Sequence, residues 1–350
     1  MQPLSLSLLD AFFEKEKETS LSGRWIRLKD IEPLINKQHK NFAVKQIGLS
    51  EQQRPIYHIQ LGSGKKKILI WSQMHGNEST GTKAIFDLLN TLTKTTESSV
   101  ENILSECTLH IIPMLNPDGA EVYTRVNAAK VDLNRDAVDR TAVESQLLRT
   151  MLARLQPDFC FNLHDQRTIF GVEGSKKPAT ISFLAPSEEA TRALTLGRKQ
   201  TMNVIIAMNT VLQQVIPNAV GRYTDEFYPT ATGDTFQKLG YNTILIESGH
   251  YPNDYEREIT RKYTFFSLLQ GIHHIATNNV YEEYEAYFSI PNNVENFYDV
   301  IHRYQNTDKK DVAYQYEEKI IANKLVFDLQ KIAHVNLNNH FSHHEIVFES

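Results

Sequence analysis

The chain has 350 residues, of which 41% are hydrophobic and 23% charged, as in ordinary globular proteins that bury a substantial core. Its net charge of −5 excludes a generally basic surface, so we expect neither nucleic acid nor an anionic membrane as a partner. Two cysteines are too few for a disulfide framework, and no apolar run approaches the roughly 20 residues that span a bilayer. We therefore expect a cytoplasmic protein in which Cys107 and Cys160 are buried free thiols.

The first part of the chain alternates helical and strand patterns. Apolar residues at helical spacing predict helices over 5–17 and 28–39. Two alternating segments then predict a half-exposed hairpin, and an apolar segment at 66–73 predicts a strand covered on both faces. The hairpin strands and the elements that follow are expected at 42–49, 55–62, 80–96 (helix), 108–115 (strand), 143–155 (helix) and 158–164 (strand).

The second part of the chain continues this alternation up to about residue 280. Strands alternating with helices predict a layered α/β fold, with helices on both sides of a mainly parallel sheet. Beyond that point the pattern changes to short helical stretches and β strands, so we predict a large α/β domain with an N-terminal helical extension over 1–280 and a small C-terminal α+β appendage over 281–350. The elements expected between are a strand at 180–186, a helix at 188–213, a polar loop at 217–233, a strand at 242–249 and a helix at 254–276.

The segment WSQMHGNESTGT, which follows the buried strand at 66–73, carries the first candidate site. Active sites of open α/β sheets lie at the carboxyl ends of strands, where His75 and Glu78 fall. Gly76 allows the sharp turn that lets an imidazole and a carboxylate converge. The segment FNLHDQ ends another buried strand at His164. Two histidines and one glutamate are a known ligand set for catalytic zinc, and Asn162 or Asp165 could orient these ligands.

Two further segments carry polar residues suited to catalysis or substrate binding. Glu247 lies in ILIESG, among apolar residues, where an ionised carboxylate is costly without a partner or a function; a structural ion pair is the alternative to general-base work. Arg125 and Arg135 lie in the polar segment after residue 115, and Asn134 beside Arg135 adds a donor for a carboxylate.

Taken in order, H-G-N-E, N-P-D-G, R-x-N-x-x-x-V-D-L-N-R, N-L-H-D and I-E-S-G resemble the zinc carboxypeptidase family, the M14 metallopeptidases, over roughly residues 40–280. The resemblance implies an α/β/α sandwich around a mixed sheet of about eight strands. It implies one zinc ion per chain, bound by His75, Glu78 and His164. It also implies that Arg125 polarises the scissile carbonyl, that Asn134 and Arg135 bind the substrate's terminal carboxylate, and that Glu247 is the general base.

The chain departs from the family pattern in ways that bear on substrate choice. Asp136 follows the N-R pair where an aromatic is common, and Asp165 follows the third ligand. No clean motif marks the tyrosine that caps the substrate; Tyr228 fits best by its distance from Glu247, and Tyr223 is the rival.

These observations predict a zinc metallocarboxypeptidase that removes a C-terminal residue from a peptide by metal-activated water. One alternative is an N-acyl amino acid deacylase, which resembles the succinylglutamate desuccinylase and aspartoacylase branch; a catalytically silent binding module is another. Either enzyme would act on a substrate with a free carboxylate. The histidine-rich segment 340–345 is interpreted as a surface turn.

Overall fold

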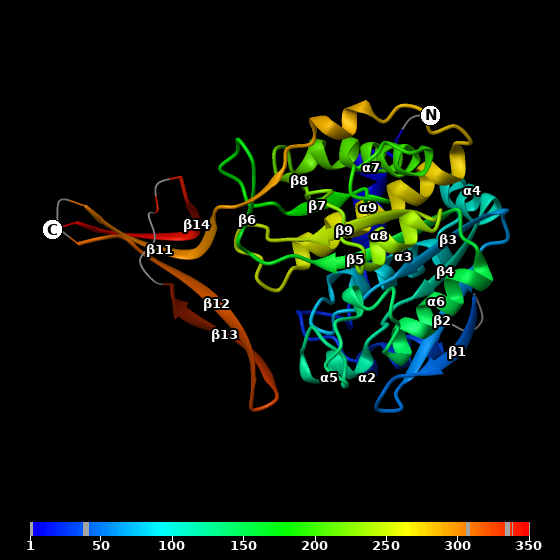
Figure 1. The fold of residues 1–350 in the computed structure, drawn as a ribbon, viewed down its shortest axis with the longest axis horizontal. Coiled ribbons are helices and arrows are strands. Elements are labelled where there is room, and N and C mark those ends of the chain that lie inside the picture. The colour runs from blue at the N-terminus through cyan, green and yellow to red at the C-terminus, as the bar shows by residue number, and fades with distance from the viewer. Residues whose placement is uncertain (1–2, 38–41, 306–308, 333–336, 338, 350) are drawn as a thin grey trace.

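A mixed sheet of eight strands forms the centre of the computed structural model, which describes residues 3–37, 42–305, 309–332, 337 and 339–349 (Figure 1). Its strands lie in the order β1-β2-β4-β3-β5-β9-β7-β8, with parallel pairing from β4 through β3 and β5 to β9 and between β7 and β8. The strands are β1 (Ala43–Leu49), β2 (Pro55–Leu61), β3 (Lys66–Trp71), β4 (Cys107–Ile112), β5 (Phe159–Asp165), β7 (Ile181–Leu184), β8 (Val220–Arg222) and β9 (Asn242–Ser248).

Helices cover both faces of this sheet, which confirms the predicted three-layer α/β/α architecture (Figure 1). The larger apolar core lies on one face, beneath α1 (Leu6–Glu16), α2 (Leu28–Lys37), α3 (Thr80–Lys94), α4 (Ser98–Glu106), α7 (Leu196–Val215) and α9 (Glu258–Thr277). A smaller core lies on the other face, beneath α6 (Val143–Leu155) and α8 (Thr232–Lys238). The short helix α5 (Pro117–Val122) and a 3-10 turn, η1 (Leu133–Arg135), follow β4.

The side-chain alternation of β5 decides which residues can reach the site. All seven residues of β5 are buried, as expected for a strand covered on both faces. Phe161 and Leu163 belong to the larger core, and Cys160 belongs to the smaller one. Successive side chains of a strand point to opposite faces, so His164 projects on the side of Cys160 and Asp165 on the side of Phe161.

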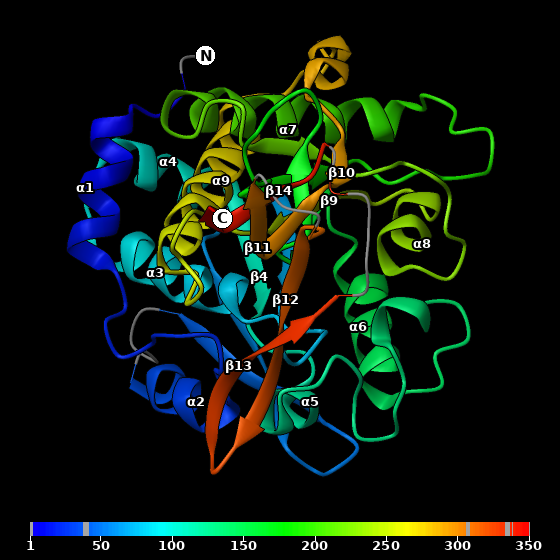
Figure 2. The same cartoon turned by 90° about the vertical axis from the view of Figure 1, so that its left-hand side faces the viewer.

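A second sheet forms the C-terminal part of the chain and lies at one side of the α/β part (Figure 1). Its strands lie in the order β13-β12-β11-β14, and a short pair of β10 with β6 lies at the junction. Seen from the side in Figure 2, β12 crosses in front of the central sheet. The bounds are β6 (Phe170–Val172), η2 (Glu285–Ser289), β10 (Asn293–Glu295), β11 (Phe297–Gln305), β12 (Val312–Ile321), β13 (Lys324–Lys331) and β14 (Phe341–Glu349).

Several elements differ from the sequence-based expectation. The long helix α7 begins at Leu196 rather than 188, and the short helices α4 and α8 were not predicted. The prediction of a surface turn at 340–345 is wrong, because Phe341–Glu349 forms β14 in parallel pairing with β11. The segment HHEIVFE itself has the pattern of a β strand, and that prediction is confirmed within β14. Cys107 and Cys160 are free and buried as predicted, and no described helix is long and apolar enough to cross a membrane.

Candidate metal and catalytic site

The loop between β3 and α3 presents His75 and Glu78. It packs so closely on α5 that a Cβ atom at Gly76 would lie 2.0 Å from the carbonyl carbon of Gly119. Only glycine avoids that clash, which explains its place between the two polar side chains. The backbone N–H of Glu78 donates to the carbonyl of His75, and α3 begins two residues later.

Three potential ligands converge where this loop meets the end of β5. Nδ1 of His75 lies 2.8 Å from Oε1 of Glu78, and Nδ1 of His164 lies 2.9 Å from Oε2 of the same carboxylate. The two imidazole Nδ1 atoms are 3.2 Å apart. All three side chains are buried, and their ligand atoms lie within 4.8 Å of one another. Of the clusters that the described residues could form, this is the one compatible with a bound metal ion.

The geometry of this cluster fits zinc. A tetrahedral zinc ion with bonds of ~2.0–2.1 Å separates its ligand atoms by about 3.3 Å, close to the spacing of the two Nδ1 atoms. Two imidazoles and one carboxylate supply three ligands, as catalytic zinc sites do, and leave one position for water or substrate. The carboxylate oxygens of Glu78 lie 2.8 and 2.9 Å from the two Nδ1 atoms, so they would move away from the imidazoles by roughly half an ångström around a bound zinc ion.

Asp132 orients His75 from outside this cluster. Its Oδ1 lies 3.1 Å from Nε2 of His75, the ring nitrogen that faces away from Glu78 and His164. The same Oδ1 also accepts from the backbone N–H of Asn134. A carboxylate behind a ligating histidine fixes the ring and the tautomer that leaves Nδ1 free to bind.

The protonation states of the triad follow from burial and from mutual contact. Burial opposes the charged form of Glu78, but His75 and His164 outweigh it and hold the pKa of Glu78 well below its usual range. Burial lowers the pKa of His164. For His75, the carboxylates of Glu78 and Asp132 overcome burial and raise its pKa. The lowered pKa of Glu78 and the lowered pKa of His164 both favour the deprotonated forms that bind metal ions.

Glu247 lies beside His164 on the adjacent strand. The two residues are register partners in the parallel pair of β5 and β9, so their side chains project from the same face of the sheet. Burial, followed by the nearby carboxylates of Glu78 and Asp165, raises the pKa of Glu247 well above its usual range. A carboxyl group with a raised pKa near a catalytic metal is suited to accept and return a proton.

Arg125 contacts both the metal ligands and their support. Its Nε donates to Oδ2 of Asp132 at 2.9 Å, and its Nη1 lies 3.3 Å from Oε1 of Glu78. The side chain is 45% exposed, so its remaining N–H groups can reach a bound substrate. A guanidinium at the edge of a metal site can stabilise negative charge on an oxygen atom.

Asn134, Arg135 and Tyr228 form a second group near this site. The amide oxygen of Asn134 accepts from the backbone N–H of Thr232 at 3.1 Å, which joins η1 to the start of α8. The guanidinium carbon of Arg135 lies 5.0 Å from the ring centroid of Tyr228. Both side chains are exposed, and Tyr228 is 53% exposed.

Tyr223, the other candidate for the capping tyrosine, is influenced by the charges of Glu247 and Glu78. Burial raises its pKa first, and the charges of Glu247 and Glu78 raise it further. Its ring packs against Phe170, with centroids 5.3 Å apart. The two tyrosines therefore lie in different surroundings: Tyr223 is mostly buried against Phe170, whereas Tyr228 is exposed and lies against Arg135.

Sequence reasoning named Asn162 and Asp165 as possible supports for the ligands and did not single out Asp132. Asp165 fits this role, because its backbone N–H donates to Glu78 and its carboxylate accepts from Thr80. Asn162 makes no side-chain hydrogen bond among the described residues. The sequence signal that could have indicated this orienting role was the position of Asp132 within V-D-L-N-R, two residues before Asn134.

The sequence comparisons agree on one family over part of the chain. A family model described as zinc carboxypeptidase matches residues 30–150. Carboxypeptidase 2 of Trichophyton tonsurans is 25% identical over 126 residues, which are 33% of this chain and 23% of that protein. Carboxypeptidase E of Caenorhabditis elegans is 28% identical over 124 residues, 29% of this chain and 26% of that protein. The match thus spans about a quarter of the length of these curated relatives.

Solved structures extend the likeness to the fold. The carboxypeptidase A of Helicoverpa armigera superimposes with a TM-score of 0.56 at 17% identity, covering 77% of this chain and 80% of that one. Bovine thrombin-activatable fibrinolysis inhibitor, solved with a tick carboxypeptidase inhibitor, gives 0.58 at 16% identity, covering 73% and 98%. Residues 30–150 thus match the zinc carboxypeptidase family model, and the chain has the fold of the solved carboxypeptidases.

Proposed function

We propose that the protein is a zinc-dependent carboxypeptidase that removes the C-terminal residue of a peptide. The observation that carries the proposal is the position of Glu247, which faces the same side as His164 beside a cluster suited to zinc. A general base next to three metal ligands and an open fourth position is the arrangement that peptide hydrolysis needs.

His75, Glu78 and His164 would hold the zinc ion, which when bound supplies Lewis acidity and acidifies water. Glu247 accepts a proton from the attacking water and later delivers it to the nitrogen of the leaving amine. Arg125 donates to the oxygen of the scissile carbonyl as negative charge develops on it.

Asn134 and Arg135 place the substrate. The guanidinium of Arg135 makes no ion pair within the described part of the chain and can take a terminal carboxylate through two parallel hydrogen bonds. Tyr228 lies against that guanidinium, so we assign to it the covering of the bound terminal residue.

The test compares a peptide that has a free C-terminal carboxylate with the same peptide as its amide. The free acid should be cleaved at least tenfold faster, as kcat/KM, and Arg135→Ala should remove most of that preference. Arg140→Gln, a change of another exposed arginine in the same segment, is the matched control and should behave as wild type. Equal turnover of acid and amide would refute the exopeptidase function.

A second candidate, an N-acyl amino acid deacylase, is favoured by one observation: strand β12 of the C-terminal sheet lines the same pocket as Glu78 and Arg125. Such an enzyme would also require the free carboxylate, so the discriminating substrates are an acetyl-dipeptide and an acetyl or succinyl amino acid. A carboxypeptidase releases the terminal residue from the first, whereas a deacylase cleaves the acyl group from the second.

A further inference from the structure

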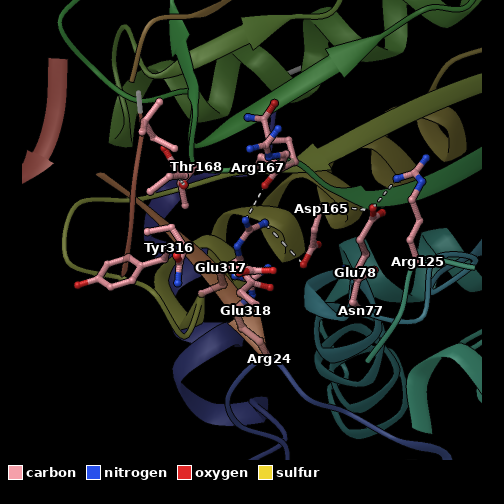
Figure 3. A pocket seen from close by; sticks show the side chains of 15 residues that line it. Arg24, Asn77, Glu78, Arg125, Asp165, Arg167, Thr168, Tyr316, Glu317 and Glu318 are labelled. Carbon is pink, nitrogen blue, oxygen red and sulfur yellow. Dashed lines mark hydrogen bonds and ion pairs between the residues drawn. The ribbon is translucent and has the colours of Figure 1, made fainter. Parts of the chain in front are cut away.

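A pocket of about 540 Å³ begins at the candidate metal site and ends at the C-terminal sheet. Figure 3 shows Glu78 and Arg125 at one side of it and Tyr316, Glu317 and Glu318 at the opposite side. This volume is within the usual range of small-ligand sites, ~300–1,000 Å³. The hairpin of β12 and β13 therefore supplies one wall of the cavity that contains a metal ligand.

The proposed function places this pocket on the amino side of the scissile bond. Asn134, Arg135 and Tyr228, the proposed binding group for the terminal carboxylate, do not line it. If they hold the C-terminal residue, the pocket receives the part of the substrate on the amino side of the cut. That part would then extend from Arg125 towards the hairpin.

The end of β12 near the turn to β13 is fixed to the N-terminal part of the chain by a buried ion pair. Arg24 is 6% exposed, and its guanidinium contacts the carboxylate of Glu318 on β12. The hydroxyl of Tyr123 donates to the other oxygen of that carboxylate at 2.6 Å. Removing one partner of such a pair leaves a buried charge uncompensated, so this contact resists displacement of the hairpin.

The middle of β12 is fixed by Asp299, a residue of β11 that is 0% exposed. Its carboxylate accepts from the hydroxyl of Tyr255 at 3.0 Å, from the backbone N–H of Tyr316 at 2.7 Å and from the Gln315 amide. The Gln315 amide also donates to the hydroxyl of Thr168, which lies in the loop after β5. The buried carboxylate of Asp299 thus bonds to β12 and to Tyr255 at once, which holds β12 in place beside the pocket.

We propose that the β12–β13 hairpin limits the enzyme to short substrates, by blocking the path of a peptide that extends beyond a few residues on the amino side of the cut. This inference rests on the proposed function. Most lining residues carry charged or amide side chains, and Tyr316 and Ile332 are the larger apolar ones.

The test uses the zinc-loaded full chain and a ladder of free-acid peptides with one shared C-terminal dipeptide and lengths of two, three, five and ten residues. We expect kcat/KM for the ten-residue peptide to be at least tenfold below that for the tripeptide. Binding of the same ladder to the Glu247→Gln variant gives a second readout that needs no turnover, and affinity should fall with length in the same order.

Two variants connect the effect to the hairpin. The double change Glu317→Ala and Gln330→Ala removes side chains that face the pocket and touches neither anchor, so cleavage of the ten-residue peptide should rise at least fivefold. Lys324→Ala, at an exposed position at the start of β13, is the matched control and should leave the length profile unchanged. Equal cleavage of all lengths by wild type, together with equal binding of all lengths by Glu247→Gln, would overturn the inference and leave the proposed function standing. Zinc-loaded protein that cleaves no peptide of any length would instead overturn the proposed function, and binding without length dependence would then overturn the inference too.

Discussion

His75 is oriented by Asp132, whose carboxylate lies 3.1 Å from Nε2 and so directs Nδ1 towards Glu78 and His164. Asp132 also accepts from Arg125, so one carboxylate fixes both a metal ligand and the cation beside it. Burial raises the pKa of this carboxyl group, but His75 and Arg125 outweigh burial and hold the pKa far below its ordinary value.

Asp132→Asn should therefore weaken zinc binding without removing a ligand. Loss of a carboxylate behind a ligating histidine typically costs ~10–100-fold in metal affinity. Competition with a chelator measures that affinity directly. His164→Ala, which removes a ligand, should lower zinc content well below one ion per chain, and unchanged zinc affinity in both variants would contradict the assigned site.

Glu247→Gln should abolish turnover while leaving the fold and the zinc content intact. General acid–base catalysis typically contributes ~10²–10⁴-fold, so kcat should fall by at least about a hundredfold. Peptide hydrolysis and elemental analysis on the same preparation check both parts. Glu226→Gln, an exposed glutamate in the loop before α8, is the control. Activity of the Glu247 variant within tenfold of wild type is incompatible with the general-base role.

Tyr228 and Tyr223 can be told apart by kinetics. Tyr228→Ala should raise KM by several fold with little change in kcat, because it removes the ring that lies against the proposed carboxylate-binding Arg135. Tyr223→Phe removes a hydroxyl near Glu247 and should change kcat instead. Steady-state kinetics of the two variants on one peptide make the comparison. A rise of KM in the Tyr223 variant alone would transfer the capping role to Tyr223.

Acid should loosen the hairpin through Glu318. Burial opposes ionisation of Glu318, but Arg24 and the Tyr123 hydroxyl outweigh it and lower its pKa below the ordinary value of 4.5. A lowered folded-state pKa contributes stability that is fully present above the unfolded-state pKa and is lost as pH falls through the folded-state value. Wild type should thus lose this contribution below about pH 4.5.

Glu318→Gln isolates that contribution. At pH 7 the variant should be less stable than wild type by up to about 3 kcal/mol, because Arg24 keeps its charge in a buried position. The difference should shrink as the pH falls and Glu318 of the wild type becomes protonated. Urea unfolding at several pH values measures it, and a gap that stays constant from pH 7 to 3.5 would contradict the ion-pair assignment.

The sequence allowed the sheet and the convergence of His75, Glu78 and His164 to be predicted, because both leave local patterns. The apolar strand before His75 and the one that ends at His164 mark buried strands, and polar residues at their carboxyl ends mark a site. The place of Arg24 could not be predicted, because its partner Glu318 lies 294 residues away and single charges carry no pairing signal. Asp299 likewise is an ordinary acidic residue until the fold brings four donors to it.

The pairing of β5 with β9 has a consequence for which changes in length the chain tolerates. His164 and Glu247 stand opposite each other only because the two strands keep one alignment along their length. A single residue inserted into β9 ahead of Glu247 would turn its carboxyl group to the opposite layer, towards the apolar core beneath α7 and α9, while the metal ligands stayed in place. Such a protein would bind zinc and lack its base, whereas an insertion of equal size in the loop after Ser248 would leave the carboxyl group where it is. Tolerance of insertions should thus change abruptly within a few residues of the same strand.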